Sequence, residues 1–383
     1  MPSSQRMNIA ACYESNCGGE TVATEEIIRA LLKRPDVHVI SKNLPPLTHT
    51  GSVRFFGWVF WSISRWTIFL WKRRFVDCVY TTTFTAGVAA AIIKPLGGFR
   101  IVWHYHGTRL PPPPDGLRGK VFITQWMKQK VVYTLHVYFL RCANLIIVPS
   151  LRGKDDLRRI FGSVFSPIVH IIPNGVDLTR FSPVSQKKRS ALRRRYGIAQ
   201  DARVILSVGR LEKQKGIESL FSVFSLLVAS ERKAVLILAY PKTTNPAALA
   251  YKKELVLLAG ALGIKKYISW KEGVKKIEEL YRASDLVISL SQQETFSLVL
   301  LEAIASGVPV LSAATGAAST MLPRIDKRLV VRFVSPVSVA RRLQVILQWT
   351  EAKQLLVRRR MNVLARVYTW DRCAKKIEKA LFI

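Results

Sequence analysis

The chain is poor in cysteine. Its 383 residues include five cysteines, an odd number with no CxxC pair among them. They are Cys12, Cys17, Cys78, Cys142 and Cys373. This scattered placement argues against a disulfide framework and against a zinc site, and it favours a reducing compartment. The N-terminal residues lack the apolar core and small-residue cleavage site of a signal peptide, so we expect a cytoplasmic location.

Acidic residues are also scarce. Asp and Glu number 25 against 59 Lys and Arg, which gives a formal net charge of +34 and a pI near 10.4. This excess attracts polyanions such as nucleic acid, anionic lipid or phosphorylated substrates, and it does not choose among them. The hydrophobic content of 49% excludes global disorder and suffices for the two domains that the length suggests.

The sequence has no solenoid-like repeat and no P-loop, and its one low-complexity segment is Pro111–Pro114. Strand-like and helix-like stretches alternate instead, which predicts an α/β fold with parallel sheets. The predicted strands are Met7–Tyr13, Val37–Ser41, Asp77–Thr81, Arg100–Tyr105, Asn144–Pro149, Pro167–Ile172, Arg203–Gly209, Ala234–Tyr240, Tyr267–Trp270, Asp285–Leu290 and Pro309–Ser312.

Turn residues at Ile172–Asp177 interrupt this alternation. We therefore predict two doubly wound, Rossmann-like domains, 1–180 and 181–366. Ligands of such sheets bind at the carboxyl ends of the strands. We expect the active site in a cleft across which the two domains face each other.

The segment Gly209–Gly216 follows the first predicted strand of the second domain and carries Arg210 and Lys215. On a loop that opens a helix, these two cations can neutralise a diphosphate, and the helix N-terminus adds backbone donors. The alternative is an ordinary basic surface loop.

Glu294 and Glu302 lie eight positions apart around an apolar run. Carboxylates accept hydrogen bonds, and sugars offer many hydroxyl donors. We predict that Glu294 faces a ligand at the start of a helix and that Glu302 lies two turns further along the same face. The alternative is one helix N-terminal charge and one exposed glutamate.

His104 and His106 end a predicted strand and share one of its faces, so a metal pair is conceivable. No third ligand cluster is visible, and we predict no metal. At the carboxyl end of the strand, His106 is better placed to contact a substrate, whereas His104 is expected to be packed. The Gly18-Gly19 turn would let a ligand approach the backbone closely, although an ordinary turn is the commoner explanation.

With these features in this order, the chain resembles a family 4 retaining glycosyltransferase of the GT-B fold over nearly its whole length. The matching motifs are the two Glu residues with seven residues between them, IPNGVD at Ile172–Asp177, GRLxxxKG at Gly209–Gly216, Ala283-Ser284-Asp285 before a strand, and AIASGVPV at Ala303–Val310. The resemblance implies an N-terminal acceptor-binding domain and a C-terminal nucleotide-sugar-binding domain. It also implies a C-terminal helix, 367–383, that packs back on the first domain.

The resemblance further implies roles for the matching residues. His106 and Glu294 would be the catalytic contacts to the transferred sugar. The donor-binding residues would be Gly18, Gly19, Arg210, Lys215, Phe296, Ser297, Leu298 and Glu302. Arg210 and Lys215 would hold the diphosphate, and Glu302 would accept hydrogen bonds from the ribose hydroxyls. The backbone amides of 296–298 would bind phosphate or sugar oxygens. The donor would be a UDP- or GDP-hexose, with no metal and no other cofactor. Two mechanisms would retain the configuration at the anomeric carbon: attack from the face that the leaving group occupies, or a double displacement. The sequence does not decide between them.

Three positions depart from the family pattern. Ser297 stands where the family usually has glycine, Tyr240-Pro241 stands where it often has a glycine pair, and Ala317–Thr320 lacks the usual Pro-Glu. Because of these departures, the sequence does not predict which base and which sugar the donor carries. The reaction type is affected less.

The segment Gly51–Arg74 is rich in tryptophan and in basic residues. It is too short, and too interrupted by Arg65, for a transmembrane span. Tryptophan and basic residues on an apolar helix are typical of a helix that lies in the membrane interface. The predicted membrane contacts are Trp58, Trp61, Trp66, Arg65, Lys72, Arg73 and Arg74. The alternative is a helix packed within the first domain.

We therefore expect a peripheral enzyme at the cytoplasmic face of a membrane that forms an α-linkage to a lipid-linked glycan or a glycolipid. The basic runs Lys187–Arg189 and Arg193–Arg195 would add attraction to anionic lipid. The alternatives are a soluble glycosyltransferase with a non-lipid acceptor and a basic nucleic-acid-binding protein on a transferase-like scaffold. The basic residues are spread along the chain without a nucleic-acid-binding motif, so no specific nucleic-acid partner is expected.

Overall fold

The chain forms two compact units. The computed structural model describes residues 6–14, 19–44, 52–107, 119–162, 168–332 and 335–382. Unit 1 consists of Met1–Pro173 and Trp370–Ile383, and unit 2 consists of Asn174–Thr369. Unit 2 thus begins at Asn174 and ends at Thr369, whereas the predicted second domain was 181–366.

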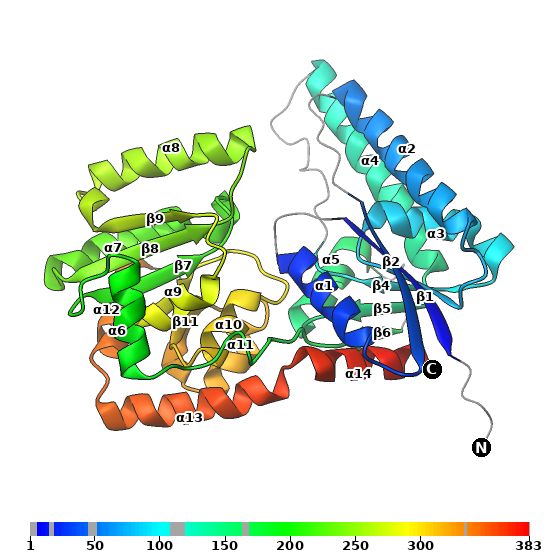
Figure 1. The fold of residues 1–383 in the computed structure, drawn as a ribbon. Helices are drawn as coiled ribbons and strands as arrows, with labels where there is room; N and C mark the ends of the chain where they lie inside the picture. Colours follow the sequence, from blue (N-terminus) through cyan, green and yellow to red (C-terminus); the bar gives the residue numbers. More distant parts are fainter. Residues whose placement is uncertain are drawn as a thin grey trace. The chain divides into compact units, whose positions relative to one another are not determined.

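Unit 1 contains a parallel six-stranded sheet in the order β2-β1-β3-β4-β5-β6 (Figure 1). Its strands are β1 (Met7–Glu14), β2 (Val37–Leu44), β3 (Cys78–Thr81), β4 (Arg100–His104), β5 (Leu145–Val148) and β6 (Val169–Ile171). Its helices are α1 (Gly19–Leu31), α2 (Ser52–Trp71), α3 (Phe84–Gly97), α4 (Gly119–Cys142), α5 (Leu151–Phe161) and α14 (Trp370–Leu381).

The strands of unit 1 are short apolar runs. Every residue of β3 and of β5 is buried, as is typical of parallel strands whose two faces are both covered. The last helix, α14, packs against α1. Arg34 Nε lies 2.9 Å from Glu378 Oε2, and Arg100 Nη1 donates to the carbonyl of Leu381 at 2.7 Å. The end of the chain is therefore part of unit 1.

Unit 2 contains a second parallel six-stranded sheet in the order β12-β11-β10-β7-β8-β9. Its strands are β7 (Arg203–Val208), β8 (Ala234–Tyr240), β9 (Ile268–Glu272), β10 (Leu286–Ser289), β11 (Val310–Ala313) and β12 (Val330–Val331). Its α-helices are α6 (Gln186–Arg195), α7 (Ile217–Ser230), α8 (Pro246–Ala261), α9 (Ile277–Ala283), α10 (Leu298–Ala305), α11 (Ala318–Met321), α12 (Pro336–Leu347) and α13 (Glu351–Val367). Its 3-10 helices include η2 (Lys213–Lys215), η3 (Lys265–Tyr267), η4 (Leu322–Arg324) and η5 (Lys327–Leu329).

The strand order of unit 2 indicates where a ligand site is expected. The chain runs outward from β7 through β8 to β9 on one side, and from β10 through β11 to β12 on the other. The neighbouring strands β7 and β10 therefore mark the point where the winding reverses. Loops at the carboxyl ends of two such strands diverge and leave a crevice, which is where doubly wound sheets bind ligands.

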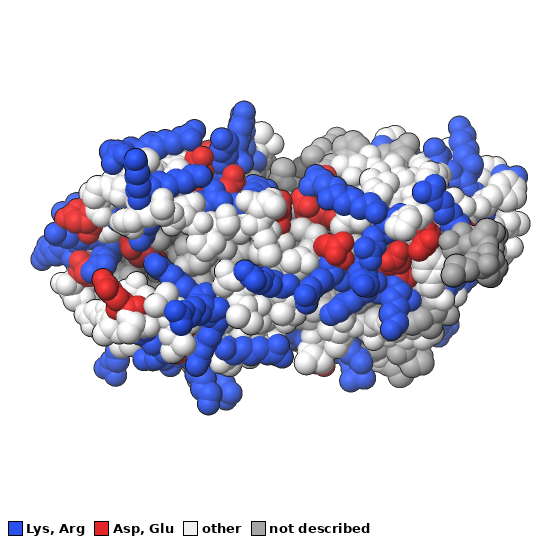
Figure 2. All heavy atoms as spheres, turned by 60° about the horizontal axis from the view of Figure 1, so that its bottom comes forward, with Lys and Arg blue, Asp and Glu red and all other residues white. Residues whose placement is uncertain are grey.

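Two arginines of unit 2 form ion pairs that hold a helix against the sheet. Arg189 and Arg193 on α6 contact the two oxygens of Asp285 at 2.6 and 2.7 Å, and the amide of Val204 donates to the same carboxylate at 2.7 Å. Arg193 is buried and also donates to the carbonyl of Ala202. The prediction that these two arginines supply cationic surface is wrong, because both join α6 to the sheet. Other Lys and Arg side chains are spread over the face shown in Figure 2, among few Asp and Glu.

Helix α2 has a buried side and an exposed side. Trp66, which we predicted to contact a membrane, is 0% exposed and packs edge-to-face on Phe69 with ring centroids 5.9 Å apart. That prediction is wrong, because Trp66 belongs to the core of unit 1. Trp61 is exposed, while the side chain of Trp58 lies outside the described residues. Across the described ranges, no helix combines the length and hydropathy needed to cross a bilayer.

Candidate functional site

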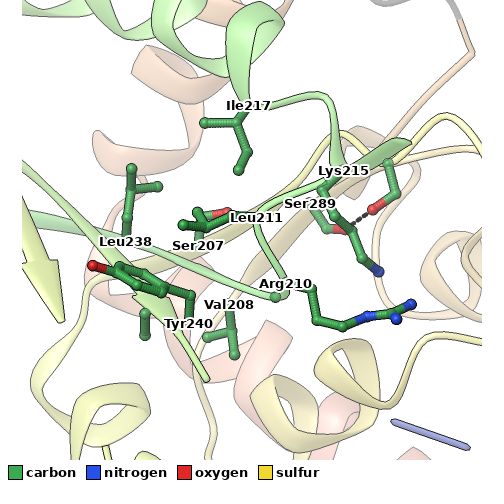
Figure 3. Close-up of a pocket in the computed structure, with 12 residues that line it drawn as sticks. Ser207, Val208, Arg210, Leu211, Lys215, Ile217, Leu238, Tyr240 and Ser289 are labelled. Carbon is green, nitrogen blue, oxygen red and sulfur yellow. Dashed lines mark hydrogen bonds between the residues drawn. The ribbon is translucent and has the colours of Figure 1, made fainter. Parts of the chain in front are cut away.

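A pocket opens at the carboxyl ends of β7, β8 and β10 in unit 2 (Figure 3). It is lined by Ser207, Val208, Gly209, Arg210, Leu211, Lys215, Ile217, Leu238, Ala239, Tyr240, Ser289 and Ser291. Arg210 and Lys215 extend to one side of the pocket, and Leu238 and Tyr240 lie on the other. The cations on one side of the pocket can bind phosphate oxygens, and Leu238 and Tyr240 on the other side offer apolar surface.

The loop after β7 is held against the end of β10. The amide of Gln292 donates to the carbonyl of Gln214 at 2.8 Å. Gly216 has a φ of +65°, and a Cβ built on it would lie 2.3 Å from the carbonyl oxygen of Leu290. Only glycine combines this backbone conformation with so close an approach. The contact sets where the cationic loop lies relative to β10.

Lys215 and Glu294 form an ion pair at the edge of this pocket. Lys215 Nζ lies 2.6 Å from Glu294 Oε1, and both side chains are largely buried. A Cβ on Gly316 would lie 3.1 Å from the Cβ of Glu294, so the backbone at Gly316 packs closely against Glu294. Arg210 contacts Glu212 at 3.0 Å. The structure thus brings Lys215 and Glu294 together, a contact that no local sequence pattern indicates.

Glu294 lies in the loop that precedes α10, and not on the helix. The helix begins at Leu298, so Glu294 and Glu302 do not share a helix face, and that prediction is wrong. The reason is the backbone of Ser297, whose φ of 78° interrupts the helical path. Ser297 is the only residue other than glycine with a positive φ in the described part of the chain.

Replacing Ser297 with glycine should stabilise unit 2. A side chain at this φ costs about 1–3 kcal/mol, and glycine loses about 0.5–1 kcal/mol more backbone entropy on folding. We expect Ser297→Gly to raise the free energy of unfolding by about 1 kcal/mol, measured by urea denaturation. Ser335→Gly is the matched control, because Ser335 also precedes a helix without a side-chain cap and has an ordinary φ of −83°. A loss of stability in Ser297→Gly equal to that in the control would contradict this account.

Glu302 lies on α10 and is held by a neighbouring helix. Tyr281 on α9 donates its hydroxyl to Glu302 Oε2 at 2.6 Å. Burial raises the pKa of Glu302, and the hydrogen bond from Tyr281 opposes this shift. Burial and the nearby carboxylate raise the pKa of Tyr281, so Tyr281 keeps its proton and acts as the donor. Sequence reasoning missed Tyr281, which is 21 positions from its partner and marked by no spacing pattern.

Gly19 and His106, the predicted ligand-contacting residues of unit 1 that the structure describes, lie beyond the carboxyl ends of strands β1 and β4. Gly19 begins α1, directly after residues that are not described, and Gly18 is among those. His106 follows β4, and its ring stacks on that of His104 with centroids 4.2 Å apart. His104 is fully buried and contacts the hydroxyl of Tyr80 through Nδ1. Within the described ranges, no group of three or more His, Cys, Asp and Glu side chains is arranged to hold a metal ion.

Two buried histidines of unit 1, His104 and His136, and partly buried His106 should make this unit sensitive to mild acid. Burial lowers the pKa of His106 and of His136 from 6.5 to about 4, and it lowers that of His104 well below 6.5. As the pH falls through 6.5, the unfolded chain takes up protons at these sites and the folded unit does not. We expect the free energy of unfolding to fall by about 1.4 kcal/mol per pH unit for each histidine.

This dependence is measured by urea denaturation between pH 7 and pH 5. His136→Gln should remove about a third of the slope, because one of three histidines then no longer titrates. His38→Gln is the control, since His38 is exposed on β2. A free energy of unfolding that stays constant over this range would refute the prediction.

Solved structures share this arrangement of two parallel sheets. The sucrose-phosphate synthase of Thermosynechococcus elongatus aligns with a TM-score of 0.78 at 20% identity, over 98% of each chain. HepE of Anabaena, in complex with UDP and glucose, aligns with a TM-score of 0.76 at 19% identity, over 98% of this chain and 100% of that one. At these identities the likeness establishes the fold, which is the GT-B glycosyltransferase fold.

Two family models together match most of the sequence. The Glycosyltransferase Family 4 model matches residues 17–180, and the Glycosyl transferases group 1 model matches residues 188–360. The chain belongs to this family of glycosyltransferases. D-inositol 3-phosphate glycosyltransferase of Geodermatophilus obscurus is 32% identical over 217 residues, which are 55% of this chain and 46% of the relative. The match thus spans about half the length of that curated relative.

Proposed function

We propose that this chain transfers a hexose from a UDP- or GDP-hexose to an acceptor hydroxyl, with retention and formation of an α-linkage. The observation that carries the proposal is the Lys215–Glu294 pair beside Arg210, at the carboxyl ends of β7 and β10. Two cations there fit a diphosphate, and a carboxylate next to them fits sugar hydroxyls. Family membership supports the same activity.

In this proposal Lys215 changes partners when the donor binds. Its ammonium group leaves the carboxylate of Glu294 for the diphosphate oxygens, and Glu294 then accepts hydrogen bonds from the hexose. Arg210 contacts the diphosphate from the same loop, and Glu302 accepts from the ribose hydroxyls. The backbone amides of 296–298 face phosphate or sugar oxygens. The family resemblance assigns the remaining contacts, to the sugar and to the diphosphate, to His106 and Gly19 of unit 1.

The reaction proceeds by attack on the face from which the nucleotide leaves. The bond between the anomeric carbon and the diphosphate oxygen breaks, and its electron pair goes to the diphosphate. The acceptor oxygen bonds to the same carbon, and its proton passes to a diphosphate oxygen. Arg210 and Lys215 stabilise the charge that accumulates on the leaving group, which is the role that a metal ion has in other transferases.

For the acceptor we propose a lipid-linked glycan or a glycolipid held at an anionic membrane, with the protein bound peripherally to the cytoplasmic face. The net charge of +34 and the exposed tryptophans of α2 support this choice. A small phosphorylated acceptor is the second candidate. The relative from Geodermatophilus obscurus is a D-inositol 3-phosphate glycosyltransferase, and the same charge favours a phosphorylated acceptor.

A thermal-shift screen of nucleotides and nucleotide sugars tests the proposal. A ligand at a hundred times its Kd stabilises the folded state by about 2.7 kcal/mol, so UDP or GDP should raise the unfolding midpoint by about 5–10 °C. Transfer assays with lipid-linked and with water-soluble phosphorylated acceptors then separate the two acceptor classes. An unfolding midpoint that no nucleotide raises would count against the whole proposal.

Replacing Tyr281 with phenylalanine should weaken donor binding. The change withdraws the proton donor from partly buried Glu302, which raises the pKa of that carboxyl further and turns it from the ribose. We expect KM for the donor to rise about tenfold while kcat changes little. Tyr196→Phe is the matched control, because Tyr196 donates to Glu279 at 2.9 Å, away from the pocket. Equal KM values in the two variants would exclude this positioning role.

A further inference from the structure

The outward side of α2 is an apolar surface with no described partner in unit 1. It carries Phe60, Trp61, Ile68 and Trp71, and Phe75 follows in the turn after the helix. The exposed fraction of these side chains ranges from 48% for Trp71 to 82% for Phe75. We call these five residues, together with Arg65 and Lys72 between them, the α2 outer face. Five apolar side chains this exposed along one element form a patch of the kind that marks an interaction site.

The core of unit 1 does not require this surface. The opposite stripe of α2, with Val59, Trp66, Phe69 and Leu70, is buried and packs toward α3. A helix that only covers a core needs apolar residues on one side, whereas α2 is apolar all round. The outer face therefore has a purpose other than folding, and its residues recur at helical spacing, as in Trp61, Arg65, Ile68 and Lys72.

Cations accompany the exposed aromatic rings. The guanidinium of Arg65 lies 4.7 Å from the ring centre of Trp61. That of Arg74 lies 5.0 Å from the ring of Trp71 and 4.6 Å from that of Phe75. The segment from Ser52 to Val76 contains no Asp or Glu. The charges that this segment adds to its apolar and aromatic face are thus all positive.

The neighbouring helix repeats this combination. Figure 1 shows α4 beside α2, and the two helices contact each other. On α4, Ile123, Trp126 and Met127 are exposed, and Lys130 Nζ lies 5.8 Å from the ring centre of Trp126. A second helix of unit 1, in contact with α2, therefore also exposes a tryptophan with an adjacent cation.

We propose that the α2 outer face docks on an anionic lipid bilayer, with α2 lying in the interface. Aromatic rings are favoured at the level of the headgroups, and Lys and Arg side chains reach lipid phosphates from there. A second copy of this chain would bring like charges together, because the face carries no carboxylate to pair with its cations. The proposal rests on the membrane-held acceptor proposed above, and it assigns the membrane contact to unit 1 and to Trp61, Trp71 and Phe75 in place of Trp66.

Vesicle cosedimentation tests the proposal with a surface variant and a matched control. The variant is Trp61→Ser/Trp71→Ser/Phe75→Ser. The control is Leu257→Ser/Leu355→Ser/Val363→Ser, which changes three exposed apolar residues of unit 2. The vesicles are phosphatidylcholine alone or with about one third phosphatidylglycerol. We expect the wild type and the control to bind anionic vesicles, and the variant to bind them at least about tenfold more weakly.

A charge variant provides a second arm that leaves the aromatic residues in place. Arg65→Glu/Lys72→Glu should weaken binding to anionic vesicles and leave binding to neutral vesicles unchanged, because only the electrostatic part is lost. Equal binding of wild type and the triple variant, or no binding of the wild type, overturns the proposal. A wild type that self-associates in sedimentation velocity while the triple variant does not would show that the face is a contact between copies.

Hydrolysis of the nucleotide sugar, measured without lipid, separates this proposal from the proposed function. Hydrolysis that persists in wild type and variant while vesicle binding is absent leaves the glycosyltransferase proposal standing and removes the docking face. Vesicle binding that depends on the three aromatic residues, with no hydrolysis in any protein, would support the docking face and count against the glycosyltransferase proposal.

Discussion

Replacing Lys215 with alanine should lower kcat/KM for nucleotide-sugar hydrolysis or transfer by about 10²–10³-fold, mostly through kcat. Lys215 Nζ lies on the cationic side of the unit 2 pocket, 2.6 Å from Glu294. In the proposed reaction, negative charge accumulates on the diphosphate as the glycosidic bond breaks. A cation held at that point stabilises the transition state more than the ground state, so its removal raises the barrier.

The neighbouring lysine supplies the control. Lys213 lies two residues earlier on the same 3-10 helix, its side chain is 76% exposed, and its ammonium group is 3.8 Å from Glu254. Lys213→Ala removes the same charge from the same loop and should leave kcat/KM within about twofold, because an exposed ion pair contributes little. Lys215→Arg keeps the charge and should recover part of the lost rate.

A double variant shows whether Lys215 and Glu294 act as one unit. Because their side chains contact each other, the effects of Lys215→Ala and Glu294→Gln on kcat/KM should not add in the combined variant. Wild-type activity in Lys215→Ala, or an equal loss in Lys213→Ala, would show that the pocket is not the donor site.

The sheets could be predicted from the sequence because buried parallel strands are short apolar runs between turn residues. The predicted strand Ala234–Tyr240 coincides with β8, and Arg203–Gly209 differs from β7 by one residue. The two-residue strand β12 was missed, since two residues carry no pattern. The point where the winding of unit 2 reverses follows from the strand order, which the sequence alone does not contain.

The interior of the candidate site could be predicted only in part. Arg210 and Lys215 stand out as cations on a glycine-bounded loop, and that loop does line the pocket. The pairing of Lys215 with Glu294 and of Tyr281 with Glu302 depends on which loops and helices meet in space. Trp66 was misassigned for the same reason. The sequence of a helix that is apolar on all sides does not show which side packs against the core.

Replacing Gly216 with alanine should lower the free energy of unfolding of unit 2 by about 2–4 kcal/mol. A side chain at its φ of +65° costs about 1 kcal/mol, and its Cβ would lie 2.3 Å from the carbonyl oxygen of Leu290. That oxygen belongs to the backbone just after β10, so relief requires the loop or the strand end to move, at about 1–3 kcal/mol. Urea denaturation measures the loss.

Gly263→Ala separates the two contributions. Gly263 has nearly the same φ, +68°, and nothing lies within 4 Å of its Cβ position. It should lose only the conformational part, about 1 kcal/mol, and the difference between the variants reports the contact between the loop and β10. Since that contact also sets where Arg210 and Lys215 lie, Gly216→Ala should lose the thermal shift with UDP or GDP even where it remains folded, and Gly263→Ala should keep it. Equal stability losses in the two variants would mean that the loop is free to leave β10, and the proposed donor site would then not be preformed.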